Sequence, residues 1–131
     1  MPIQPRKKYH EYEFYYSEYI EEELKELGYK DSDINRLARQ LVNHVEATPS
    51  RLKGDVIKKT GGAVKLRISP KESVKGVQGE DRIIYCYLNK SKFFFLAVYG
   101  KSEKTDLTNE EIKDIRNAVI ALKKQFKGES K

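Results

Sequence analysis

The stretch RIIYCYLNKSKFFFLAVYG, residues 82–100, decides the fold class of this chain. Its halves RIIYCYLN and KFFFLAVYG are dense in β-branched and aromatic residues, and a short polar NKS segment joins them. The stretch therefore predicts two strands connected by a hairpin turn. Upstream, AVKLRIS (63–69) alternates apolar and polar side chains, which is the two-residue period of a half-buried strand. Together the three segments predict a meander of antiparallel strands.

Helical patterns flank this meander. Apolar residues recur at helical spacing in SEYIEEELKELG (17–28) and in DSDINRLARQLVNHVEATP (31–49), which a short connection joins into a helical hairpin. A third helix is predicted over TNEEIKDIRNAVIALKKQF (108–126), and the aromatic segment EYEFYY (11–16) can form an opening strand. Helices, then strands, then a helix indicate an α+β fold with an antiparallel sheet.

Local signals mark the helix ends. Ser17 is a candidate N-cap for the first helix, and Gly28 is placed to end that helix with a positive φ. Thr108 with Glu111 three residues later forms the pattern of a capping box. These signals support the predicted boundaries.

Length and composition limit the class of protein. A chain of 131 residues fits a single domain, 1–131, in which we expect residues 1–9 and 127–131 to be flexible. It has no run of about 18 apolar residues, as a membrane span needs, and its N-terminal segment lacks the apolar core of a signal peptide. Its single cysteine, Cys86, cannot form an internal disulfide. A reducing cytoplasm is therefore the simplest compartment.

Positive charge is concentrated in the middle of the chain. Residues 1–50 carry 7 Lys and Arg against 10 Asp and Glu, a balance of −3, whereas residues 51–104 carry 13 against 5, a balance of +8. Such asymmetry favours a polyanionic partner, and nucleic acid before a membrane, because no basic amphipathic helix lies in the positive region. A lysine-rich solvated surface is the alternative interpretation.

Five cations form the candidate catalytic set. Lys65 and Arg67 alternate with apolar residues and so share one face of their strand, which we expect to be exposed to solvent. Arg82 opens the next strand, and Lys101 and Lys104 follow the last one. In a meander these side chains can converge at one end of the sheet and form a phosphate-binding concavity.

Two further pairs are candidate RNA contacts. Lys58 and Lys59 add charge before the first strand of the meander, and Tyr85 and Tyr99 offer rings on which bases can stack. Each candidate also has a structural reading: the lysines as solvated charges, the tyrosines as core residues, and Arg82 as a partner of its neighbouring aspartate.

Conventional catalytic patterns are missing from the sequence. His10 and His44 are far apart and stand alone, and no cluster of Cys and His has metal-ligand spacing, so we expect no metal site and no cofactor. No Walker loop or nucleophile elbow occurs, and the TGG segment at 60–62 is too short for a phosphate loop. An enzyme built on this chain would work with Lys, Arg and Tyr.

Three separated blocks carry a resemblance to a known family. GDVIKKTGGAVKLRIS (54–69), DRIIYCYL (81–88) and FFFLAVYGKSEKTDLTNEE (93–111) resemble, in order and spacing, the RelE/ParE superfamily of bacterial toxins, and within it the HigB-like branch. The resemblance implies a helical hairpin packed on a curved antiparallel sheet with a C-terminal helix. It also implies a type II toxin that cleaves mRNA on the ribosome without a metal and is held silent by a cognate antitoxin, often of the helix-turn-helix type.

The resemblance places the site on the five cations, with two departures. Val64 stands where the family has the first of two basic residues, and Asp81 precedes Arg82 where an aromatic is usual. The first departure would weaken phosphate binding, and the second puts a carboxylate beside a proposed catalytic cation. The superfamily also contains poisons of DNA gyrase that do not cut RNA, so a gyrase poison and a non-cleaving nucleic-acid-binding module stay open as alternatives.

The implied chemistry is consistent with these residue types. Attack of a 2′-hydroxyl on phosphorus needs a base, a stabiliser of the developing charge, and an acid for the leaving oxygen. A lysine surrounded by other cations gives up its proton more readily, because like charges disfavour the protonated form. Arg67 and Arg82 can stabilise the charge at phosphorus. The sequence does not assign base and acid among Lys65, Lys101 and Lys104.

Overall fold

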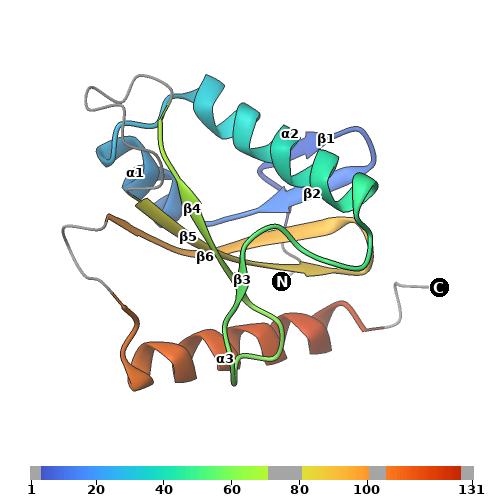
Figure 1. Ribbon diagram of the computed structural model, residues 1–131, viewed down its shortest axis with the longest axis vertical. Coiled ribbons are helices and arrows are strands. Elements are labelled where there is room, and N and C mark those ends of the chain that lie inside the picture. Colours follow the sequence, from blue (N-terminus) through green and yellow to red (C-terminus); the bar gives the residue numbers. More distant parts are fainter. Residues whose placement is uncertain (1–3, 71–80, 101–105, 128–131) are drawn as a thin grey trace.

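A computed structural model describes residues 4–70, 81–100 and 106–127 of the chain. Within these ranges a six-stranded sheet is covered by helices on both faces (Figure 1). The elements in chain order are β1 (Lys7–Tyr9), β2 (Tyr12–Tyr15), α1 (Glu18–Glu26), α2 (Asp31–Ala47), β3 (Asp55–Val56), β4 (Val64–Ile68), β5 (Asp81–Leu88), β6 (Lys92–Gly100) and α3 (Asn109–Gln125). No helix in these ranges is long and apolar enough to cross a membrane.

The predicted meander is present, but the sheet is not purely antiparallel. The strand order is β1-β2-β6-β5-β4-β3, and β4, β5 and β6 pair in antiparallel fashion as expected. The opening strand β2, however, runs parallel to β6, with Phe14 beside Phe93. The prediction of an antiparallel sheet is therefore wrong at this pair, because a contact between residues so distant in sequence leaves no local pattern.

The order of elements also differs from the expected one. A β-hairpin, β1 with β2, comes before α1 and α2, so the chain does not begin with the helical hairpin that the sequence predicted. The helix signals are confirmed. The Ser17 hydroxyl accepts a hydrogen bond from the Ile20 amide at 3.2 Å, and Gly28 has a φ of +98°. The Thr108 amide and the Glu111 carboxylate complete the capping box at 2.9 Å.

The two faces of the sheet belong to different cores. On one face, α1 and α2 pack their buried residues, such as Leu24 and Leu41, against Ile83 and Tyr85 of β5. On the other face, α3 packs against a second cluster that includes Ile84 and neighbouring residues of β5 and β6 (Figure 1). Because strand side chains alternate between faces, neighbouring residues of one strand belong to different cores.

The thiol of Cys86 is buried in the core on the α3 side of the sheet. The residue is 1% exposed and lies on the α3 face of β5. Burial in this apolar setting raises the pKa of its thiol to about 12. The cysteine therefore serves as a small apolar core residue at physiological pH.

Candidate functional site

Three predicted site residues lie in one row across the sheet. Arg67 on β4 is directly opposite Arg82 on β5, and Arg82 is directly opposite Tyr99 on β6. Side chains at such opposed positions lie about 5 Å apart at their Cβ atoms. Lys65 lies two residues before Arg67 on β4, and we call the three cations Lys65, Arg67 and Arg82 the cation row. They share the α3 face of the sheet, since Lys65 is opposite Ile84 of the α3-side core.

A β-bulge brings Tyr99 to this face. Tyr85 is opposite Phe95 but Ile84 is opposite Ala97, so Leu96 is an extra residue in β6. One extra residue reverses the alternation of side chains along the rest of a strand. Without the bulge, Tyr99 would face α1 and α2; with it, Tyr99 belongs to the α3-side core beside Arg82.

Like charges directly opposite one another destabilise a sheet, and this arrangement is present at Arg67 and Arg82. Arg67 is exposed and Lys65 half-buried. Within the described ranges, neither side chain forms a hydrogen bond or ion pair. Arg82 Nη1 donates to the main-chain oxygen of Asp81 at 3.2 Å, which fixes the guanidinium near the strand end. The cation row thus concentrates positive charge on one face, and the bond to Asp81 O holds Arg82 in place.

The two departures from the toxin pattern fall on the opposite face. Val64 is fully buried in the core formed with α1 and α2, so a cation at that position would not add to the cation row. The Asp81 carboxylate accepts a 2.8 Å hydrogen bond from the Tyr29 hydroxyl and is 8% exposed. It therefore points away from Arg82, although the two residues are adjacent in sequence.

The tyrosines are core residues. Tyr85 is fully buried on the α1 and α2 face, and its hydroxyl donates to the main-chain oxygen of Lys53 at 2.5 Å. Burial raises the pKa of Tyr85 well above its ordinary value. The expectation that bases stack on Tyr85 does not fit this position. Tyr99 is on the site face but only 4% exposed, so its ring offers no open stacking surface either.

Lys58 and Lys59 lie in the loop between β3 and β4. Both are exposed, and Lys59 has a φ of +69°. The same loop contains the TGG segment, where the Thr60 hydroxyl donates to Ile57 O at 2.7 Å and accepts from the Ala63 amide at 3.1 Å. This segment is a turn held by its own threonine, and Lys58 and Lys59 are exposed charges beside it.

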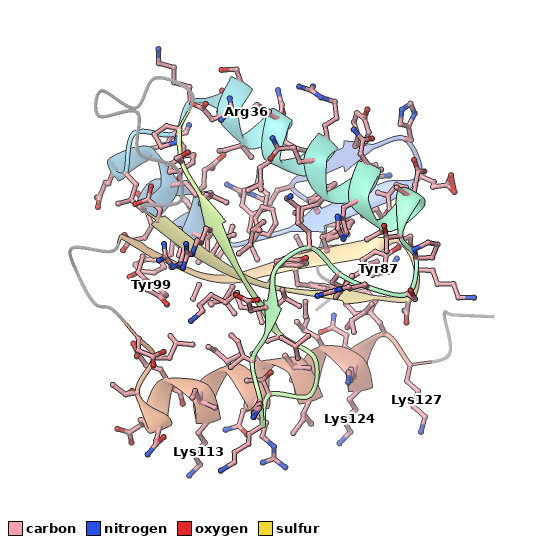
Figure 2. The ribbon with its side chains drawn as sticks, in the orientation of Figure 1. Arg36, Tyr87, Tyr99, Lys113, Lys124 and Lys127 are labelled. Carbon is pink, nitrogen blue, oxygen red and sulfur yellow. The ribbon has the colours of Figure 1, made fainter. Side chains whose placement is uncertain are left out.

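Two predicted cations, Lys101 and Lys104, lie outside the described residues. In the described ranges, no group of three His, Cys, Asp or Glu residues is arranged to hold a metal ion. Arg36, which lies on α2, is not among the site residues predicted from the sequence (Figure 2). Its Nη1 donates to the Asp33 carboxylate at 2.9 Å and its Nη2 to Ser69 O at 3.2 Å. The sequence alone does not distinguish a helix arginine that forms such bonds from one that is exposed to solvent.

Comparison with known proteins shows similarity to solved structures but to no family model. Among solved structures, the chain is similar to a double arginine-to-alanine mutant of the E. coli toxin RelE in the free state, at 17% sequence identity and a TM-score of 0.49. The match covers 83% of this chain and 97% of the toxin chain.

Proposed function

We propose that this chain is the toxin of a type II toxin–antitoxin pair and cleaves mRNA on the ribosome without a metal ion. The observation that carries the proposal is the opposition of Arg67 and Arg82 on one face of the sheet. The arrangement costs stability, and it suits a doubly charged phosphorane. The three-block resemblance to the HigB-like branch of the RelE/ParE superfamily supports the same conclusion.

The proposed chemistry is transesterification at one phosphate. The 2′-oxygen attacks the adjacent phosphorus after losing its proton to a base, the bond from phosphorus to the 5′-oxygen breaks, and the leaving oxygen takes a proton. A 2′,3′-cyclic phosphate and a 5′-hydroxyl result. Arg67 and Arg82 stabilise the charge that develops on the phosphorus oxygens. Lys65, Lys101 and Lys104 are the candidates for proton transfer, and the ribosome positions the RNA.

The proposal includes three partners and a compartment. The substrate is mRNA in a translating ribosome, and a cognate antitoxin, which we expect to carry a helix-turn-helix domain, neutralises the toxin. These partners act in the bacterial cytoplasm, where a buried free thiol such as Cys86 is compatible with the reducing conditions.

The test is expression of the chain alone in bacteria. Growth arrest is expected, and primer extension of a translated mRNA should show cuts phased with the codons. Lys65→Ala combined with Arg82→Ala should abolish both effects. Lys124→Ala is the matched control, because Lys124 lies on α3 and points away from the sheet (Figure 2).

Other outcomes would contradict the proposal in distinguishable ways. Arrest that survives Lys65→Ala with Arg82→Ala would show that the cation row is not the site. Arrest with intact mRNA and an induced DNA-damage response would indicate a gyrase poison. Harmless expression combined with salt-sensitive RNA binding would indicate a binding module.

A further inference from the structure

An open groove of about 580 Å³ lies between α2 and the outer edge of β4, on the side of the sheet away from α3. Its volume is in the range of ligand sites. The residues that line it come from several separate elements and are largely polar, among them Tyr29, Arg36, Gln40, Lys53, Arg67 and Ser69. Of the predicted site residues that the structure describes, only Arg67 belongs to this groove.

The groove has an excess of positive charge. Among the described residues that line the groove, Arg36 and Lys53 contribute two cations against a single carboxylate, Asp33, whereas Arg67 lines the groove with its main chain. That carboxylate is 5% exposed and already holds Arg36 Nη1 and the Lys30 amide, each at 2.9 Å. The charge that the groove presents to a ligand is therefore positive, and it favours an anion.

The Arg36 guanidinium is fixed in place. Its two bonds, to the Asp33 carboxylate and to Ser69 O, tie α2 to the end of β4. A guanidinium has five N–H donors in a rigid fork, so donors are left for a ligand after these two bonds. Preorganisation of this kind lowers the entropic cost of binding a phosphate.

Arg67 connects the groove with the cation row. The Ile57 amide donates to Ala63 O at 2.9 Å, so residues of odd number on β4 direct their main-chain groups to the outer edge. β3 pairs only with Val64 and Lys65, so it ends before it reaches Arg67. The main chain of Arg67 thus lines the groove, while its side chain belongs to the face that carries Arg82.

We propose that this groove binds the sugar–phosphate backbone of single-stranded RNA as the strand leaves the cation row and passes over the edge of β4. The inference rests on the proposed function, because it places the scissile phosphate at Arg67 and Arg82. RNA is favoured over an acidic peptide because Arg67 connects the groove with the cation row, where the proposed function places a phosphate of the same strand. The phosphates of that strand can meet the cation row, then Lys53 and Arg36, in succession.

The experiment measures RNA binding by the full chain as a function of salt. Fluorescently labelled 2′-O-methyl RNA, which lacks the attacking hydroxyl, is used at lengths of about four and about twelve nucleotides. The long oligonucleotide is expected to bind more tightly and with a steeper dependence on salt. Lys53→Ala should lower the slope of log K against log salt for the long oligonucleotide by about 0.7, the value for one phosphate contact on a single strand. It should leave the short one unchanged.

Two controls make the test specific. Lys53→Ala keeps the main-chain oxygen that accepts from the Tyr85 hydroxyl, so the fold is expected to persist. Lys124→Ala removes the same charge from α3, on the other side of the sheet from α2, and should not distinguish the two lengths (Figure 2). Equal salt slopes for the two RNA lengths, or equal effects of the two variants, would overturn the proposal.

The competing occupant of the groove is a peptide that pairs as an added strand with the open edge of β4 at Arg67. If an acidic peptide, but not RNA, slowed hydrogen exchange at the Arg67 amide, the groove would be a peptide site and the RNA proposal would be wrong. Failure of the groove proposal is separable from failure of the function. Growth arrest that depends on Lys65 and Arg82, with no gain in binding from RNA length, would overturn only the groove.

Discussion

The Tyr29 hydroxyl donates a 2.8 Å hydrogen bond to the Asp81 carboxylate in the core beneath α1 and α2. Tyr29 is 4% exposed and Asp81 8%. Burial, and then the hydrogen bond to the carboxylate, raise the pKa of Tyr29 far above its ordinary value, so the phenol stays a neutral donor. This bond fixes Asp81, the first residue of β5, with its carboxylate on the face of the sheet opposite to Arg82.

Tyr29→Phe should test the strength of that bond. The change removes the donor and leaves a buried carboxylate with one partner fewer, so we expect a loss of about 1.5–3 kcal/mol in the free energy of unfolding. Urea denaturation measures it. Tyr9→Phe on β1 is the control, because in the described ranges the Tyr9 hydroxyl forms no hydrogen bond. Equal losses in the two variants would show that the Tyr29–Asp81 bond contributes little.

Arg67→Ala should separate stability from activity. Removing one of two opposed like charges relieves repulsion, and the Arg67 side chain is exposed. We therefore expect the variant to be as stable as the parent or more stable by up to about 1 kcal/mol, while its growth arrest is lost. Thermal unfolding and a plate assay measure the two effects. A clear loss of stability would mean that the arginine is a structural residue.

Glu13→Gln should give a pH-dependent loss of stability. Glu13 accepts from Lys92 Nζ at 2.9 Å and from the Tyr15 hydroxyl at 2.8 Å, and so joins β2 to β6. The hydrogen bond from Lys92 comes first among the causes that lower the pKa of Glu13. A lowered folded-state pKa gives stability that is present above the unfolded pKa and is lost as pH falls through the folded pKa.

The expected loss in Glu13→Gln is about 1 kcal/mol at pH 7, as for a hydrogen-bonded charge that is only partly shielded from solvent. Because protonation removes the same interaction from the parent, the two proteins should converge in stability at acid pH. Urea denaturation across the pH range measures this. A difference that stays constant with pH would show that packing, not the charge, is responsible.

Gly54→Ala should disturb the strand that carries Lys65. Gly54 has a φ of +117°, and a Cβ there would lie 2.7 Å from Lys65 O and 2.8 Å from Val64 Cγ1. The clash and the strained backbone together should cost at least about 2 kcal/mol. Gly62→Ala is the matched control, with a φ of +124° and nothing within 4 Å of the added Cβ. Calorimetry should show the smaller loss for the control.

Local patterns were sufficient for the individual elements. The α3 helix follows from its apolar spacing and from the capping box of Thr108 and Glu111, because both act within a few residues. The meander follows from the composition of the 82–100 stretch in the same way. The parallel pairing of β2 with β6 could not be predicted, since nothing in EYEFYY specifies which distant strand it meets.

The candidate site was predicted in part. Strand alternation was enough to put Lys65 and Arg67 on one face, and the hairpin was enough to bring Arg82 near them. That face was expected to be open to solvent, whereas α3 covers part of it and buries Tyr99. Tyr85 was expected to contact RNA, but the alternation of side chains along β5 places its ring in the core under α1 and α2.

The sequence by itself determined the strand and helix segments, the concentration of positive charge, and the pairing of cations at alternate positions. These depend on local periodicity and composition. Only the tertiary structure decided which face each residue joins: Val64 and Asp81 on the side of α1 and α2, Arg67 and Arg82 opposite one another on the side of α3. The physical reason is that register, the bulge at Leu96 and the choice of covering helix are set by long-range packing.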